Sequence, residues 1–238
     1  MRASAISLVI VALAGSVYAA DSADVFVSIY ANKDEKVSAK PDTSFWKGVK
    51  GISIVNDYFG QPIPGYHSEV RSRWTKDNLY LLYVSSYQQL TLKPDPETVK
   101  ETNQLWNFDV AEAFIGWDPE QIGRYREFEV SPHAEWVDLN IDRTAPRGTG
   151  QAGWMWNSGW KVAAQIDEKK HLWYAEMVIP WSAFSSNPPT AGTEMRANFF
   201  LSAGPSTDKK NLAWRKTDKK SFHVPEAFGK LRLEKSGK

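Results

Sequence analysis

Residues 125–142 read YREFEVSPHAEWVDLNID, and this stretch indicates the fold class. Apolar and charged side chains alternate before the central Ser-Pro pair, and Val, Leu and Ile alternate with Asp and Asn after it. A period of two is typical of a β-strand with one buried face, and Ser-Pro is typical of a turn. We therefore predict a β-hairpin whose outward face, which carries Glu127 and Glu129, is solvated.

Short strand candidates continue on both sides of this hairpin. Residues 69–74 alternate between polar and apolar, whereas residues 79–84 (LYLLYV) are apolar throughout, which is typical of a central strand covered on both faces. Residues 160–166 and 172–179 predict a second hairpin, which Pro180 ends. No long segment has the 3.6-residue period of a helix. The pattern predicts an all-β fold, an antiparallel β-sandwich of jelly-roll or immunoglobulin-like type in a single domain.

The first twenty residues differ in composition from the rest. An arginine is followed by an apolar run, and Val17 and Ala19 place small residues where a signal peptidase cleaves. The run is shorter than the ~20 residues that span a bilayer. Residues 1–19 are therefore predicted to be a signal peptide cleaved near Ala19-Ala20, rather than a buried helix or a membrane span. Residues 20–238 are expected to form one secreted or periplasmic domain.

Charge and cysteine content argue against several classes of function. The 29 basic and 28 acidic residues give a net charge of +1, so no nucleic acid or anionic membrane is expected as a partner. Without cysteine, an exported chain must be held by its own hydrophobic core. The four histidines lack the spacing of a zinc site and fall at turns and loops: His67, His133, His171 and His223.

The unusual feature is the aromatic content, with 11 tryptophans, 9 tyrosines and 11 phenylalanines. Trp74 and Trp173 lie on alternating strands and are assigned to the core. Trp106, Trp154 and Trp156 lie in or beside loops, where no packing role is evident. Sugar rings have apolar faces that lie against aromatic rings, and hydroxyls that bond to polar side chains. The composition therefore fits an exported carbohydrate-binding protein and fits equally well a protein whose tryptophans only fill the core.

Enzymatic chemistry has less support in the sequence. There is no cysteine, no Gly-x-Ser-x-Gly nucleophile elbow and no phosphate-binding glycine loop. Glycoside hydrolysis needs two carboxyl groups, one of them with a raised pKa in a dry pocket. Glu127 with Glu129, or Asp138 with Asp142, has a suitable spacing along a strand, but these pairs are assigned to a solvated face. We therefore predict no enzyme, and a glycoside hydrolase is the less favoured alternative.

Four motifs stand in a definite order along the chain. Each is weak alone, and their order and spacing carry the information. They are LYL at residues 79–81, Trp106 with DVAEAFI at residues 109–115, YREFEVSP at residues 125–132, and AW at residues 213–214 with Phe222 and FGKLRL at residues 228–233.

Together these motifs resemble carbohydrate-binding module family 9, over about residues 70–233. The resemblance implies a β-sandwich that is found beside xylanases and other glycoside hydrolases and takes part in carbohydrate catabolism. It implies that the reducing end of a glucan or xylan chain, or an oligosaccharide, is held between two aromatic residues. It further implies glycoside hydrolases on other chains as partners.

The resemblance carries over five candidate sugar-binding residues. Trp106 and Phe222 stand at the two clamp positions, and Glu112 matches the glutamate of the Asp-x-x-Glu strand. Tyr87 stands where the family has an aspartate, and Glu129 stands where it has an arginine. Because both family residues hydrogen-bond to the ligand, these two departures count against reducing-end specificity and leave a stacking site.

Two further expectations concern cofactors. Family members hold structural calcium, for which Asp109, Asp118, Asp138 and Asp142 are possible oxygen donors, without a mapped site. A related sandwich architecture binds b-type haem in exported electron-transfer domains through an axial methionine with histidine or lysine. Met177 and Met195 are the candidates for that alternative function. A lone methionine on an apolar strand is more often part of the core.

Overall fold

The computed structural model describes residues 24–145 and 154–235. The predicted signal peptide, residues 1–19, lies outside the described residues. Regular structure in the described part consists of β-strands and single turns of 3-10 helix, which confirms the all-β prediction. No helix in this part is long and apolar enough to cross a membrane.

The strands are short and mostly follow the predicted alternation. The hairpins predicted at residues 125–142 and 160–179 are β7–β8 and β9–β10. In chain order the strands are β1 (Val25–Tyr30), β2 (Ile52–Ile54), β3 (Asn56–Asp57), β4 (Ser68–Trp74), β5 (Asn78–Ser86), β6 (Val110–Gly116), β7 (Arg124–Val130), β8 (Trp136–Asp142), β9 (Lys161–Asp167), β10 (Leu172–Pro180), β11 (Glu194–Ala203), β12 (Lys210–Ala213) and β13 (Gly229–Glu234). The 3-10 helices are η1 (Leu105–Asn107), η3 (Trp181–Ala183), η4 (Ser206–Asp208) and η5 (Pro225–Ala227).

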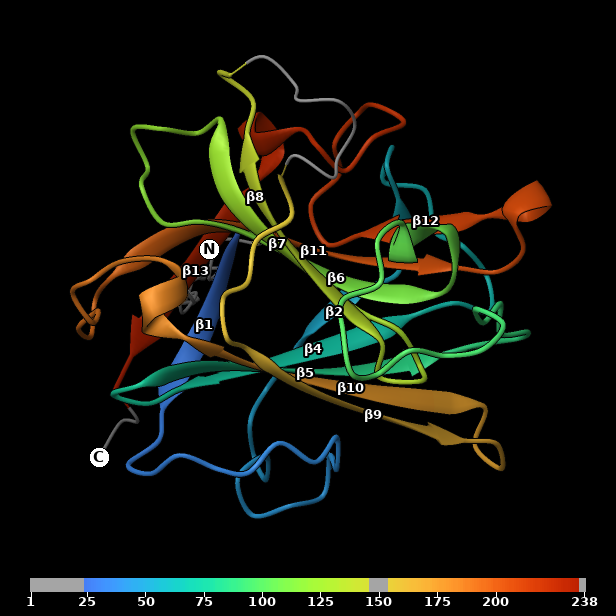
Figure 1. Cartoon of the computed structure of the whole chain (residues 1–238), viewed down its shortest axis with the longest axis horizontal. Helices are drawn as coiled ribbons and strands as arrows, with labels where there is room; N and C mark the ends of the chain where they lie inside the picture. Colours follow the sequence, from blue (N-terminus) through green and yellow to red (C-terminus); the bar gives the residue numbers. More distant parts are fainter. Residues whose placement is uncertain (1–23, 146–153, 236–238) are drawn as a thin grey trace, which may run out of the picture.

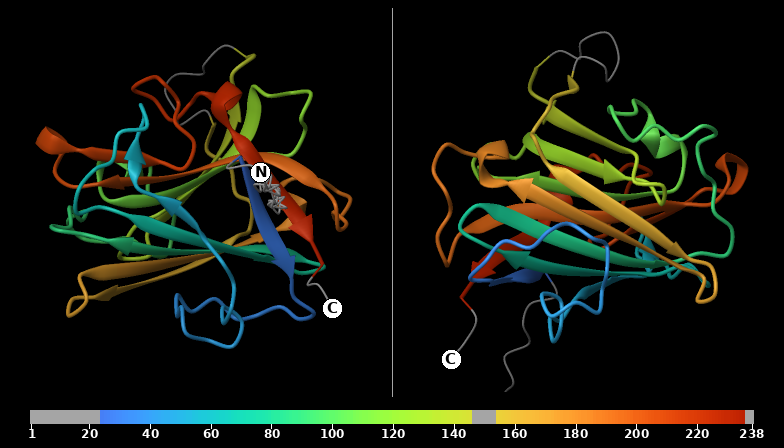
Figure 2. Two further views of the ribbon diagram at one scale, coloured as in Figure 1. Left: turned by 180° about the vertical axis from the view of Figure 1, so that it is seen from behind. Right: turned by 60° about the horizontal axis from the view of Figure 1, so that its bottom comes forward.

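The strands form a single sheet that folds back on itself. Its order is β8-β7-β6-β11-β13-β1-β4-β5-β10-β9, with β12 beside β11 and β2 beside β4. One layer holds β6, β7, β8 and β11, the other holds β4, β5, β9 and β10, and β1 with β13 joins the two along one side (Figures 1 and 2). The result is a nearly closed sandwich in which β8 and β9 are the two ends of the sheet.

The prediction of a purely antiparallel sheet is wrong at β1. This strand pairs in parallel with both β13 and β4, whereas the other paired strands are antiparallel. Parallel neighbours need a long connection, and residues 31–67 supply one between β1 and β4. Because side chains alternate in the same way in parallel and antiparallel strands, the sequence pattern could not distinguish the two.

The central core lies between the two layers. Trp74 and Trp173 are buried there, as predicted from their strand positions. Met177 and Met195, the candidate haem ligands, belong to the same core and are 0% and 4% exposed. Both methionines thus pack among apolar side chains in the way expected of core residues.

A second core covers the other face of β6, β7 and β11. Phe114, Tyr125 and Phe200 point into it from these strands, and Phe222 and Phe228 cover them from a segment near the C-terminus. The layer that contains β7 is therefore buried on both faces. This second core forms the base of the pocket described next.

Candidate functional site

The predicted solvated face of β7 is buried, and this prediction is wrong. Glu127 and Glu129 share that face with Tyr125, and the three residues are 2%, 0% and 0% exposed. The period-two alternation was correctly identified, but both faces of the strand are covered. The cover is the segment around Phe222 and His223, which is nearly a hundred residues away in the sequence.

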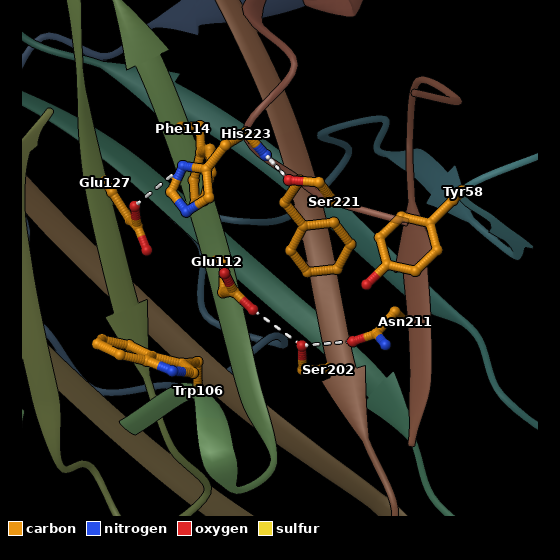
Figure 3. Close-up of a pocket in the computed structure, with 10 residues that line it drawn as sticks. Tyr58, Trp106, Glu112, Phe114, Glu127, Ser202, Asn211, Ser221 and His223 are labelled. Carbon is orange, nitrogen blue, oxygen red and sulfur yellow. Dashed lines mark hydrogen bonds and ion pairs between the residues drawn. The ribbon is translucent and has the colours of Figure 1, made fainter. Parts of the chain in front are cut away.

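A pocket of about 240 Å³ lies over this face of β6 and β7 (Figure 3). Aromatic rings and short polar side chains contribute to its wall, and carboxyl groups come from the strands beneath. The lining residues are Tyr58, Trp106, Glu112, Phe114, Glu127, Ser202, Asn211, Ser221, Phe222 and His223.

Trp106 is positioned by the short helix η1. Its neighbour Leu105 is fully buried in the second core and anchors the turn. Gln104 enters the turn with a φ of 64°, in the left-handed region, and this sharp entry turns the chain toward the pocket. Trp106 is half-buried and packs against the edge of the second core, so part of its indole lines the pocket (Figure 3).

Tyr58 reaches the pocket from a tight turn after β3. The Asp57 side chain accepts hydrogen bonds from the backbone N–H groups of Phe59 and Gln61, at 2.8 and 2.9 Å. Gly60, with a φ of 82°, supplies the left-handed conformation that this turn requires. The carbonyl of Tyr58 accepts hydrogen bonds from the backbone of residues 217 and 218, which ties the turn to the C-terminal segment.

Phe222, the second predicted clamp residue, uses much of its surface for packing. It stacks on Phe200 with ring centroids 4.0 Å apart and ring planes inclined by 19°, and it lies 5.2 Å from the Tyr58 ring. Only 9% of the residue is exposed. Trp106 and Tyr58 are both half-buried, so they have more surface available to a ligand than Phe222 has.

A short polar chain crosses the pocket. The Ser202 hydroxyl on β11 lies 3.0 Å from Glu112 Oε1 and 3.1 Å from Asn211 Oδ1 on β12 (Figure 3). The Tyr83 hydroxyl, from the opposite layer, donates a 2.7 Å hydrogen bond to the carbonyl of Glu112 and fixes the backbone of β6. Hydroxyl, amide and carboxylate groups are therefore presented together at one wall.

Three carboxyl groups converge beneath this wall. Glu112 on β6 stands directly opposite Glu129 on β7, and Glu127 lies on the same face of β7. Carboxylate oxygens from all three lie within 4.8 Å of one another. Burial is the main cause that raises the pKa of Glu112 to about 8 and that of Glu127 to about 7, and it also raises the pKa of Glu129 well above its usual range.

Two basic side chains lie near these carboxyl groups. His223 Nδ1 lies 3.9 Å from Glu127 Oε2 and 2.7 Å from the Tyr125 hydroxyl. Lys209, just before β12, is partly buried, and its ammonium donates a hydrogen bond to the carbonyl of Phe108. Its positive charge lowers the pKa values of Glu112 and Glu129 and so opposes the effect of burial.

Four of the five predicted sugar-binding residues gather here, and one does not. Trp106, Glu112 and Phe222 line the pocket, and Glu129 lies beside Glu112 beneath it. Tyr87 instead follows β5, packs against the central core and lies 5.5 Å from the ring of His171. The structure therefore separates Tyr87 from the pocket, and sugar contact by the other four stays a prediction.

Sequence reasoning missed several lining residues. The sequence predicts Glu127 only as one of a carboxyl pair with Glu129 on a solvated face, although Tyr125 on the same face is a sign that the face is covered. Tyr58 lies in a Gly- and Pro-rich loop, which gave only a general hint of a surface site. Nothing near Ser202 or Asn211 in the sequence marked them, because they reach the pocket through long-range strand pairing.

The remaining loop tryptophans have packing roles. The guanidinium of Arg126 lies 4.4 Å from the ring centre of Trp156 and 4.2 Å from that of Trp117. This sandwich explains the position of Trp156 without a ligand. Trp154 packs at the edge of the second core.

The four aspartates suggested for calcium do not form a common ligand set. The carboxylate of Asp109 accepts a hydrogen bond from the backbone of Gly204, and that of Asp142 pairs with Arg124. Within residues 24–145 and 154–235, the group of three metal-ligating side chains that lies close enough to share an ion is Glu112, Glu127 and Glu129. The structure therefore does not bring these aspartates together as one set of side-chain ligands, and structural calcium stays a prediction.

Comparison with known proteins agrees with the fold. Residues 37–236 match the profile of the family described as carbohydrate family 9 binding domain-like. An extracellular protein from Arthroderma benhamiae is 28% identical over 145 residues, which cover 56% of this chain and 64% of that protein. The chain thus spans less than two thirds of the length of this relative.

Solved structures show the same architecture. A family 9 carbohydrate-binding module from Caldicellulosiruptor kristjanssonii, solved in complex with cellotriose, superposes on this chain with a TM-score of 0.64 at 13% identity. The superposition covers 90% of this chain and 95% of the module. The structure of a family 9 module from the same organism in complex with glucose gives a TM-score of 0.62 at 11% identity, with 89% and 97% covered. Because the family profile spans most of the chain, this protein belongs to the carbohydrate family 9 binding domain-like family.

Proposed function

We propose that this protein is an exported, non-catalytic carbohydrate-binding domain that holds a sugar ring against Trp106 in the pocket over β6 and β7. The observation that carries the proposal is the pocket itself, in which half-buried aromatic rings stand beside hydroxyl, amide and carboxyl groups. Such a combination suits a sugar, which has apolar ring faces and a rim of hydroxyls.

The size of the pocket suggests how much of a glycan it takes. At about 240 Å³ it is smaller than the ~300–1,000 Å³ of pockets that enclose drug-sized ligands. A single ring at a chain end suits this volume better than an enclosed oligosaccharide. The related modules solved with glucose and with cellotriose support a small glucan ligand.

The carboxyl groups are suited to accept hydrogen bonds rather than to cleave a glycosidic bond. In a glycoside hydrolase the two carboxyl groups flank the scissile bond. Here Glu112, Glu127 and Glu129 stand on two neighbouring strands, on one side of the pocket. Burial also raises all three pKa values, whereas a nucleophilic carboxylate must stay ionised. We therefore propose that the domain has no hydrolytic activity of its own and that glycoside hydrolases on other chains act on its ligand.

The stacking role of Trp106 is tested by calorimetric titration with cello- and xylo-oligosaccharides. We expect Trp106→Ala to weaken binding by about tenfold or more, which corresponds to about 1.4 kcal/mol. The matched control is Trp117→Ala, which removes another half-buried tryptophan that packs on Arg126. Equal affinity in wild type and Trp106→Ala, or an equal loss in both variants, would contradict the assignment.

Export rests on the composition of residues 1–19. Expression in a secreting host should yield a protein whose first residue, found by N-terminal sequencing, lies at or next to Ala20. A product that retains the first twenty residues would rule out the proposed signal peptide.

A further inference from the structure

We propose that the pocket recognises a sugar that carries a primary ammonium group, such as a glucosamine unit, through Glu112, Glu127 and Glu129. This inference rests on the proposed function, since it names the class of sugar that the same pocket takes. It begins from the three carboxyl groups that the fold gathers beneath the pocket wall.

The arrangement of the three glutamates is unfavourable for the free protein. Like charges directly opposite each other in an antiparallel pair destabilise it, and Glu112 and Glu129 hold such positions. Oxygens of Glu112, Glu127 and Glu129 approach within 4.8 Å of one another, and all three residues are at most 3% exposed. Burial of a carboxylate without a compensating partner costs several kcal/mol.

Glu129 shows the missing compensation most clearly. Both of its carboxylate oxygens are buried, and no amide, hydroxyl or cationic group of the described residues donates a hydrogen bond to them. The carboxyl oxygens of Glu112 and Glu127 lie within 4.8 Å of its own, and both neighbours help to raise the pKa of Glu129. Within the described chain, no lysine or arginine lies within 4.0 Å of any of the three; the nearest basic contact is His223 at 3.9 Å from Glu127.

An ammonium group matches this arrangement better than a hydroxyl group. A hydroxyl donates one hydrogen bond and carries no charge, whereas a primary ammonium has three donors and a full positive charge. Three carboxylates around one ammonium would give three charge-assisted hydrogen bonds, each about twice as strong as a neutral one. The neutral hydroxyls of glucose or xylose cannot supply that compensation.

The aromatic lining favours an organic cation over a metal ion. Calcium takes six to eight oxygen ligands and gains nothing from indole or phenol rings. Trp106 and Tyr58 instead offer ring faces, which attract cations as well as apolar sugar faces. An amino sugar uses both halves of the pocket, because its ring can lie on Trp106 while its ammonium reaches Glu112.

Proton release distinguishes this mode of binding from that of a neutral sugar. With the pKa of Glu112 raised to about 8 and that of Glu127 to about 7, the free protein holds protons in this group near neutral pH. A bound ammonium favours the ionised carboxylates and so expels protons, whereas a neutral sugar leaves them in place. Other titratable groups of the described residues that face the cluster are Tyr58, Tyr83, Lys209 and His223.

The test is calorimetric titration of the whole mature protein near neutral pH, in two buffers with different heats of ionisation. The ligands are three oligosaccharides of equal length, built from glucosamine, from N-acetylglucosamine or from glucose. Calcium chloride is titrated alone. We expect the glucosamine oligosaccharide to bind about tenfold more tightly than the two neutral ones and to release protons. Glu129→Gln should remove this preference. Glu176→Gln, which changes an equally buried glutamate on β10, should keep it.

The outcomes separate this inference from the proposed function. Binding of cello-oligosaccharides without a preference for glucosamine overturns the inference and leaves the proposed function standing. If no sugar binds, both fail. Binding of calcium with proton release, without binding of the amino sugar, overturns the inference in favour of a metal site. If Glu129→Gln does not fold, the preference and the proton release of the wild type decide the question.

Discussion

Glu176 on β10 and Glu129 on β7 are both completely buried, but their carboxyl groups differ in their hydrogen-bond partners. The carboxylate of Glu176 accepts hydrogen bonds from the backbone N–H groups of Ser38 and Ala39, both at 2.8 Å, and from Trp46 Nε1 at 3.3 Å. Within the part of the chain that the structure describes, neither carboxyl oxygen of Glu129 has a hydrogen-bond partner, and carboxyl oxygens of Glu112 and Glu127 lie within 4.8 Å. The first glutamate fastens the loop between β1 and β2 to the sheet, whereas the second contributes nothing evident to folding. A buried carboxyl group without a hydrogen-bond partner calls for an explanation, and groups with perturbed pKa values cluster at functional sites.

The largest effect predicted from this comparison is the loss of stability when Glu176 is replaced. Glu176→Ala leaves two buried backbone N–H groups and an indole N–H without an acceptor, so we expect the free energy of unfolding to fall by about 3–5 kcal/mol. Chemical denaturation followed by fluorescence measures it. A loss below about 1 kcal/mol would show that Glu176 does not anchor the loop.

The next largest predicted effect is on how the free energy of unfolding depends on pH. The folded-state pKa values of Glu112, about 8, and Glu127, about 7, lie above the ordinary 4.5, so the folded state binds more protons than the unfolded state between these values. Stability from these groups is therefore complete below about pH 4.5 and is lost as pH rises to about 8. Denaturation of wild type and Glu127→Gln across this range should give a flatter profile for the variant. Parallel profiles would contradict the raised pKa.

A smaller effect is predicted for Glu129 itself. Glu129→Gln replaces a buried carboxyl group that has no hydrogen-bond partner and keeps the shape of the side chain, so we expect stability at neutral pH to stay equal or rise by about 1 kcal/mol. Thermal unfolding measures the change. A clear destabilisation would place Glu129 with Glu176, as a glutamate that the fold needs.

The smallest effect is predicted for Tyr87, which the family resemblance placed in the site and the structure places outside the pocket. Tyr87→Ala should change the affinity for oligosaccharides by less than about twofold. Titration of this variant beside Trp106→Ala makes the comparison. A loss equal to that of Trp106→Ala would mean that the site extends beyond the pocket over β6 and β7.

Local pattern was sufficient to predict the hairpins and the core tryptophans but not the covered face of β7. The alternation at residues 125–142 is a property of neighbouring residues, so it shows in the sequence. The burial of Glu127 depends on His223 and Phe222, which come from a distant segment and carry no local mark. Ser202 and Asn211 likewise enter the pocket through pairing of β11 with β6 and β12. Trp106 could be predicted as a pocket residue because its position before the Asp-x-x-Glu strand is itself a local motif.

The claim that the pocket over β6 and β7 binds sugar is tested most directly by the NMR signal of the Trp106 indole N–H. The signal is assigned by its loss in Trp106→Phe, and the protein is then titrated with glucosamine and cello-oligosaccharides. We predict a saturable shift of the Trp106 signal, while the indole signal of Trp117 stays in place. Saturable shifts confined to other tryptophans, with Trp106 unmoved, would contradict the assignment of the pocket.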